Sequence, residues 1–206
     1  MTKTLTALLA GLLILTLGAA VAQGTRQPDM ANLFQKVNRV ALELQTNLTD
    51  LEASIQASRD SIEQGGRVLD GMLASVTRVQ QSMAEDSEIW QELGALLELW
   101  EERRKATLER SEANPAFLPI AQAWQQRLET ARTLRNQIST ERANATALMR
   151  AIEADRDIVL AYYELGQADK AIEGLKKVGA NLANLNRNMQ VIVETANAAQ
   201  QTPIPQ

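Results

Sequence analysis

Apolar residues recur every three or four positions through most of this chain, which is the spacing of one face of an α-helix. In the first half the pattern covers fifteen positions, of which Ser58 and Gly65 are the two defects: Phe34, Val37, Ala41, Leu44, Leu48, Leu51, Ile55, Ser58, Ile62, Gly65, Leu69, Met72, Val76, Val79 and Met83. A run of about seven heptads is typical of a coiled-coil seam. No stretch after Ala22 alternates with the period of a strand. The pattern therefore predicts an all-α protein.

The second half repeats this pattern after a break at Asn114–Pro119. The break contains two prolines, Pro115 and Pro119, which end one helix and allow another to begin. The pattern loses its phase at Asp86, resumes at Trp90, and is sharpest near the end of the chain, at Ala168, Ala171, Leu175, Val178, Leu182, Leu185, Met189, Ile192, Ala196 and Ala199. The pattern predicts one helical domain over residues 23–199, with a turn at 114–119 and a disordered tail at 200–206.

Two nearly equal helical halves on either side of a tight turn indicate an antiparallel hairpin. Residues 30–113 and 117–199 would each form a helix of about 120 Å if straight. In such a hairpin, residues whose numbers add to about 232 face each other. The charges then pair as Arg39 with Glu194, Arg59 with Glu173, Arg67 with Glu164 and Arg78 with Glu153.

Three glycines lie at one level of this hairpin, Gly65 and Gly66 opposite Gly166. Glycine inside a helix costs about 1 kcal/mol relative to alanine, so we expect a shared hinge there. Two architectures are compatible with a hinge. The hairpin stays long and kinks midway, which the continuous seam favours, or both helices fold back into a four-helix bundle of residues 30–64, 67–112, 117–165 and 168–198.

The N-terminal segment has the features of a secretory signal peptide. Lys3 supplies a positive charge, and an apolar stretch from Leu5 to Gly18 follows it. Ala20 and Ala22 form an A-x-A cleavage site, which makes Gln23 the first mature residue. We therefore expect residues 1–22 to be a signal peptide and the protein to be periplasmic or secreted from a bacterial envelope. An uncleaved membrane anchor is the alternative, because the apolar stretch extended to Ala22 is just long enough to span a bilayer.

Composition excludes several kinds of chemistry. The chain has no cysteine and no histidine, so disulfides, thiolate metal sites and catalysis by Ser-His-Asp or Cys-His are impossible within it. A net charge of −4 and an aromatic share of 3% give no reason to expect nucleic-acid binding. The carboxylates Glu92, Glu98, Glu101 and Glu102 suit a solvated acidic face better than a metal site. We expect no catalytic residues, no cofactor, no resident metal ion and no enzymatic activity.

A short segment around Gly166 resembles the middle of a tetratricopeptide repeat. Residues 161–177 place Tyr162, Gly166 and Ala171 where that family has an aromatic residue, the glycine of the turn and an alanine of the second helix. The segment departs from the family at Val159, where a small residue belongs. No second copy follows at the repeat's period of about 34 residues. The resemblance implies a helical turn here.

The turn between the two halves is the best candidate for a binding surface. Phe117, Leu118 and Ile120 are apolar residues between or beside prolines, and Trp124 follows them. With Trp90 and Trp100 they either plug the end of the helical pair or present an apolar tip to a partner. We expect a non-catalytic scaffold or adaptor that binds an unknown protein through its seam or this tip, and homo-oligomers are possible. The alternative is a compact four-helix bundle that senses or carries a small ligand, near Tyr162 and Tyr163.

Overall fold

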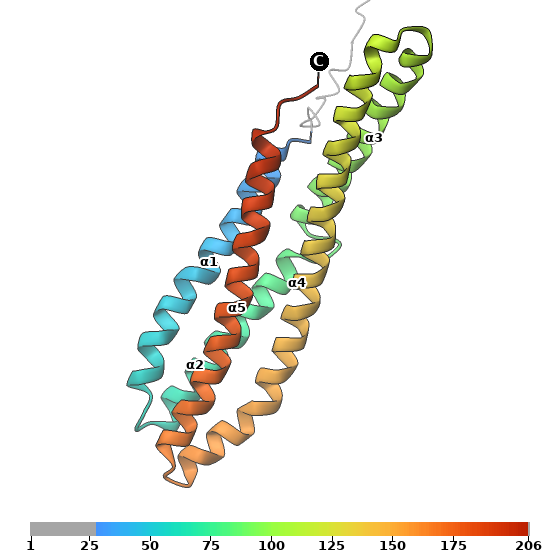
Figure 1. Cartoon of the computed structure of the whole chain (residues 1–206). Helices are drawn as coiled ribbons and strands as arrows, with labels where there is room; N and C mark the ends of the chain where they lie inside the picture. The colour runs from blue at the N-terminus through green and yellow to red at the C-terminus, as the bar shows by residue number, and fades with distance from the viewer. Residues whose placement is uncertain (1–27, 206) are drawn as a thin grey trace, which may run out of the picture.

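The protein is all-α, as the periodicity predicts. The structure, a computed structural model, describes residues 28–205. It contains five α-helices in this part of the chain and one short 3₁₀ helix (Figure 1): α1 Met30–Ala57, α2 Ile62–Ser82, α3 Glu88–Ala113, η1 Pro115–Phe117, α4 Leu118–Glu164 and α5 Ala168–Gln201. The proposed signal peptide, with Ala20, Ala22 and Gln23, lies outside the described residues.

The helices form the folded-back arrangement of the two that the sequence leaves open. The helix pairs of a hairpin are present, because α1 packs against α5 and both α2 and α3 pack against α4. In addition α1 packs against α2, and α4 against α5. A long hairpin without the fold-back cannot make these last two sets of contacts. The result is a four-column bundle in which α2 and α3 follow one another along a single column (Figure 1).

The predicted seam is the core of this bundle. Thirteen of the fifteen seam positions between Phe34 and Met83 are buried; Phe34 is half-buried and Ile62 is exposed. Every seam position from Ala171 to Ala199 is buried as well. The heptad pattern therefore identifies the buried faces correctly, although those faces close on each other in a bundle.

The chain reverses at residues 58–61 rather than at Gly65 and Gly66, which lie inside α2. The buried Ser58 hydroxyl donates to the Ile55 carbonyl as α1 ends, and the Ser61 hydroxyl accepts the Gln64 N–H to cap α2. Ser61 and Gln64 have the spacing of a capping box, which starts a helix. The hinge prediction is thus displaced by a few residues at this end. Gly166 does lie in the turn between α4 and α5, with a φ of 68° that favours glycine.

The predicted ion pairs are not the ones formed. Arg59 pairs with Asp169, Arg142 with Glu85, and Arg156 with Asp70. Arg67 instead pairs with Glu63 of its own helix, and Arg78 with Glu43 of α1. Facing residues therefore add to 226–228 rather than to 232. The register is displaced by about one helical turn because the chain reverses around Asn114, before Pro115.

The two ends of the described chain lie close together at one end of the bundle (Figure 1). The backbone N–H of Asp29, just before α1, donates to Glu92 Oε1 at 2.9 Å. At the other terminus α5 continues to Gln201, two residues into the segment expected to be disordered. Within the described residues, α3, η1 and α4 extend beyond the ends of α1 and α5 (Figure 1).

Candidate functional site

The α3–α4 turn projects beyond the rest of the bundle as a two-helix arm, which we define as residues 104–123. Asn114 caps η1 by accepting the Ala116 N–H, and Pro115 and Pro119 fix the backbone of the reversal. η1 packs against α3 and α4, and the ends of α1 and α5 stop short of it (Figure 1). The ten helical residues from Arg104 to Ala113 extend about 15 Å. The arm is therefore accessible from several sides.

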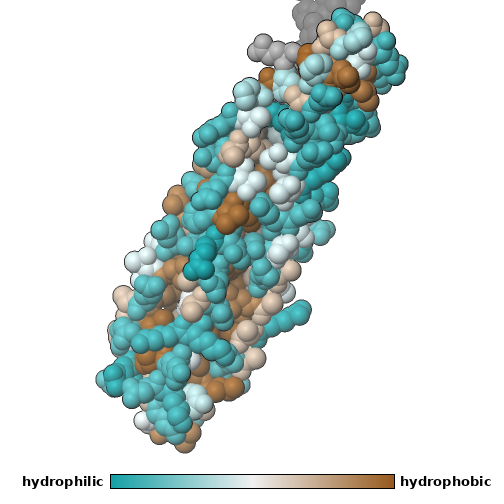
Figure 2. All heavy atoms as spheres, viewed as in Figure 1, coloured by the Kyte–Doolittle hydropathy of each residue, from teal (hydrophilic) through white to brown (hydrophobic). Residues whose placement is uncertain are grey.

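The four predicted tip residues occupy different environments in or beside the arm. Leu118 has 44% of its surface exposed, whereas Phe117 and Ile120 are half-buried. Trp124 is buried at the base of the arm and so does not belong to the exposed tip. Leu108 of α3, which is absent from the predicted site, is 42% exposed. Figure 2 shows hydrophobic residues at the surface of this end of the molecule.

Three of the four aromatic residues near the turn lie beside arginines of the α3–α4 pair. The guanidinium of Arg110 lies 6.0 Å from the centre of the Phe117 ring. Arg127 lies 5.1 Å from a Trp100 ring, and Arg135 lies 5.2 Å from Trp90. Such cation–π contacts stabilise by about 0.5–1 kcal/mol at exposed sites.

A groove of about 470 Å³ lies at the base of the arm, where the two ends of the described chain meet it. Trp100 and Trp124 of α3 and α4 line it together with Arg103 and Arg127. The other lining residues are Leu99 of α3 and four residues of the two chain ends: Pro28, Asp29, Ile204 and Pro205. Arg127 is 7% exposed, and its burial lowers the pKa of its guanidinium. An arginine nevertheless keeps its charge in a protein, so this buried cation needs hydrogen-bond acceptors.

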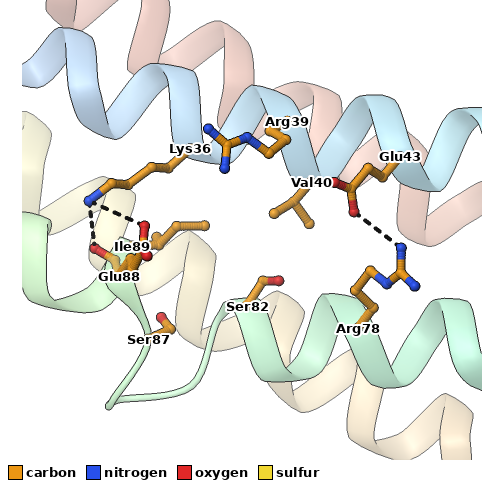
Figure 3. A pocket seen from close by; sticks show the side chains of 9 residues that line it. All are labelled: Lys36, Arg39, Val40, Glu43, Arg78, Ser82, Ser87, Glu88 and Ile89. Atoms are coloured by element: carbon orange, nitrogen blue, oxygen red, sulfur yellow. Dashed lines mark hydrogen bonds and ion pairs between the residues drawn. The ribbon is translucent and has the colours of Figure 1, made fainter.

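A second cleft, of about 390 Å³, opens between α1 and the junction of α2 and α3 (Figure 3). Lys36 in this cleft is 3.2 Å from Glu92 and 3.8 Å from Glu88. Arg78 is 3.5 Å from Glu43. The remaining lining residues are Arg39, Val40, Ser82, Ser87 and Ile89. Arg39 forms no ion pair with another described residue, so its positive charge is not paired within the cleft.

Two of the four acidic residues named as possible metal ligands, Glu92 and Glu101, are engaged with basic groups. Glu92 binds Lys36, and Glu101 accepts two hydrogen bonds from Arg104 at 2.7 and 3.1 Å. The hydrogen bond with Arg104 holds the pKa of the Glu101 carboxyl below its usual value of 4.5. Between residues 28 and 205 there is no group of three or more Asp, Glu, His or Cys side chains that could hold a metal ion.

The likeness to a tetratricopeptide repeat is limited to the turn. Gly166 joins two helices as that pattern implies, but α4 has 47 residues and α5 has 34. α4 alone is therefore longer than a whole repeat of about 34 residues.

Comparison of the chain with protein-family models, with curated proteins and with solved structures found no match. None of the helices in residues 28–205 has the length and hydropathy needed to cross a membrane. Function must therefore be inferred from the surfaces of the bundle itself.

Proposed function

We propose that this protein is an exported, non-catalytic helical adaptor that binds another protein through its arm. One observation carries the proposal: folding back buries the heptad seam inside the bundle, while the arm keeps Leu108 and Leu118 exposed. Of the two surfaces expected to bind a partner, the seam is therefore occupied by the protein itself. The arm is the one that stays exposed and can bind a partner.

The surroundings of the two leucines support this role. The arm consists of only two helices, so there is little further apolar surface against which these side chains can pack. Each buried leucine contributes about 1.5–3 kcal/mol, and burial of two by a partner would be a useful fraction of a binding free energy. Absence of histidine and cysteine supports the non-catalytic part of the proposal. The A-x-A motif ending at Ala22 supports export.

Site-specific photo-crosslinking in intact cells tests the proposal. A photoreactive phenylalanine analogue at Leu118 should yield a crosslinked protein of defined mass. The matched control is the same analogue at Leu42, which is 52% exposed on α1, where no such product should form. Equal products at the two positions, or none at Leu118, would contradict binding through the arm.

A second substitution makes the test specific. Leu108→Asp places a charge on the arm without touching the crosslinking position, and it should abolish the product formed at Leu118. Val191→Asp is the control, because Val191 is exposed to a similar degree on α5. If both variants keep the product, the crosslink arises from chance encounters and the arm is not the binding surface.

A small anionic ligand in the cleft of Figure 3 is the second candidate function. The volume of about 390 Å³ lies within the usual range for ligand sites. Arg39 of α1, across the cleft from Ser82 and Ser87, forms no ion pair with another described residue. The cleft is favoured over a ligand site near Tyr162, Tyr163 and Gly166, because the Tyr163 hydroxyl is already engaged, 3.1 Å from the Ser58 hydroxyl.

A thermal-shift series with phosphate and small dicarboxylates tests the cleft. A ligand should raise the melting temperature of the protein but not that of Arg39→Gln. The same shift in both proteins would contradict binding in this cleft.

A further inference from the structure

The segment after α5 is held by the groove at the base of the arm through one buried arginine. Arg127 donates from Nε to the Pro203 carbonyl at 3.4 Å and from Nη2 to the Thr202 carbonyl. No acidic side chain of the described chain forms an ion pair with Arg127, so these two backbone carbonyls are the acceptors for its buried charge. Hydrogen bonds to charged groups are stronger than those between neutral groups.

The held segment is extended and rich in proline. Thr202 has φ −69° and ψ 126°, close to the polyproline II conformation. Pro203 and Pro205 fix their own φ angles near the same value. An extended proline-containing segment loses little conformational entropy on binding, and it presents its carbonyls outward because it makes no internal hydrogen bonds.

The groove has the other features by which proteins recognise such segments. Trp100 and Trp124 supply two large aromatic side chains, and Arg103 adds a second cation. Aromatic-lined grooves are the usual receptors for polyproline II peptides. With residues 202–205 in place, Trp100 and Trp124 are only 4% and 8% exposed, whereas Ile204 is 68% exposed.

We propose that this groove, formed by Trp100, Trp124, Arg103 and Arg127, is a docking site for an extended proline-containing peptide, and that residues 202–205 are its intramolecular occupant. Any partner segment of this chemistry displaces residues 202–205 and takes over the two carbonyl contacts with Arg127. The proposal goes beyond binding through the arm tip, because it concerns the base of the arm and a different class of contact. It holds whether or not Leu118 contacts a partner.

Tethering makes residues 202–205 a strong competitor. A short flexible connection gives an effective concentration in the millimolar range, and this segment follows α5 directly. A free peptide should therefore bind far better when the tethered segment is absent. If the affinity for the free peptide rises when residues 202–205 are removed, these residues are an intramolecular ligand. If the affinity does not change, they are a tail that lies on the surface without occupying the groove.

The probe is a fluorescent peptide with the sequence of residues 200–205, blocked at both ends. Its fluorescence anisotropy is measured with the full chain and with a variant that ends at Gln201. Saturable binding to the shortened variant, at least about tenfold tighter than to the full chain, is the expected result. No saturation with the shortened variant up to millimolar concentrations, or equal affinity for both proteins, would overturn the proposal.

Substitution of the arginine tests the site within the shortened variant. Arg127→Gln should weaken peptide binding at least tenfold, whereas Arg132→Gln, at an exposed position on the same helix, should leave it unchanged. Far-ultraviolet circular dichroism of each variant verifies folding. Should Arg127→Gln fail to fold, Arg103→Gln replaces it, with a weakening of at least about threefold expected. An unchanged affinity in the arginine variant that folds would overturn the assignment.

A further variant serves if the shortened chain does not fold. In the full chain, Thr202 to Pro205 are replaced by Gly-Ser-Gly-Ser, which keeps the chain length and removes the prolines. This variant should bind the peptide as tightly as the shortened chain does. Binding no tighter than that of the unaltered protein would show that residues 202–205 do not occupy the groove.

Discussion

Replacing Gly65 with alanine tests how the two turns at the closed end of the bundle fit together. A Cβ atom at this position would overlap Cε2 of the Tyr163 ring and lie 2.9 Å from its Cζ. Tyr163 cannot simply swing aside, because its hydroxyl lies 3.1 Å from the buried Ser58 hydroxyl. The glycine is therefore required by the close approach of a ring, although the sequence suggested a hinge.

The expected loss of stability follows from three contributions. Overpacking of a filled site costs about 1–3 kcal/mol, and loss of the Ser58–Tyr163 hydrogen bond costs about 0.5–1.5 kcal/mol. The better helix propensity of alanine offsets up to about 1 kcal/mol. We expect Gly65→Ala to lower the free energy of unfolding by about 1–3 kcal/mol, or the melting temperature by about 2–12 °C for a chain of this size.

Gly66→Ala is the matched control, because it adds the same atom at the next position of the same helix. Its Cβ would lie 3.9 Å from the nearest atom, Cδ2 of Leu160, so it should leave stability unchanged or raise it by up to about 1 kcal/mol. Urea denaturation monitored by circular dichroism measures both. The reasoning is refuted if the two variants have the same stability, or if Gly65→Ala remains destabilising in a Tyr163→Ala background, where the clash is absent.

Three further predictions address the core, the arm and the dependence on pH. Leu134→Ala, at a fully buried position of α4, should cost about 2–5 kcal/mol in urea denaturation. Leu118→Asp should change the free energy of unfolding by no more than about 0.5 kcal/mol in the same assay, because the side chain is exposed. A larger loss would show that Leu118 packs in the core. Since Arg104 holds the pKa of Glu101 below 4.5 in the folded protein, the stability from this pair is present above pH 4.5 and is lost as the pH falls through the lowered pKa. Glu101→Gln should therefore be less stable near pH 7 and lose less stability on acidification, and parallel curves for the two proteins would contradict this assignment.

The buried faces of this protein follow from local periodicity, whereas its overall shape depends on contacts between distant residues. A heptad pattern shows which side chains need burial, but it does not specify which helix covers them. The fold-back did leave a local signal. Ser58 interrupts the seam, and Ser61 with Gln64 forms a helix-starting box directly after it. Gly65 and Gly66 predicted the hinge a few residues too late, because a glycine required by a neighbouring ring has the same sequence signature as one at a hinge.

The position of the arm could be predicted from the sequence, whereas the contacts at its base could not. Pro115 and Pro119 predict the turn, and Leu118 is exposed as a tip residue should be. The role of Arg127 could not be inferred, since it occupies an ordinary helical position and its acceptors lie 75 and 76 residues further along the chain. Only the folded structure brings the guanidinium to these carbonyls. Burial of an arginine without an acidic partner is the signal that singles it out.

The fold-back is the central claim, because it both buries the seam and leaves the arm as the displayed surface. A pair of engineered cysteines tests it most directly, and the natural chain contains no cysteine to interfere. The side chains of Asn47 on α1 and Ser75 on α2 are hydrogen-bonded at 3.2 Å, whereas in an unbent helix the same 28-residue separation would place them about 42 Å apart. The account predicts that Asn47→Cys/Ser75→Cys oxidises rapidly to an intramolecular disulfide, seen by intact mass in the monomer. A monomer that retains both free thiols under oxidising conditions, or that forms only intermolecular disulfides, would contradict it.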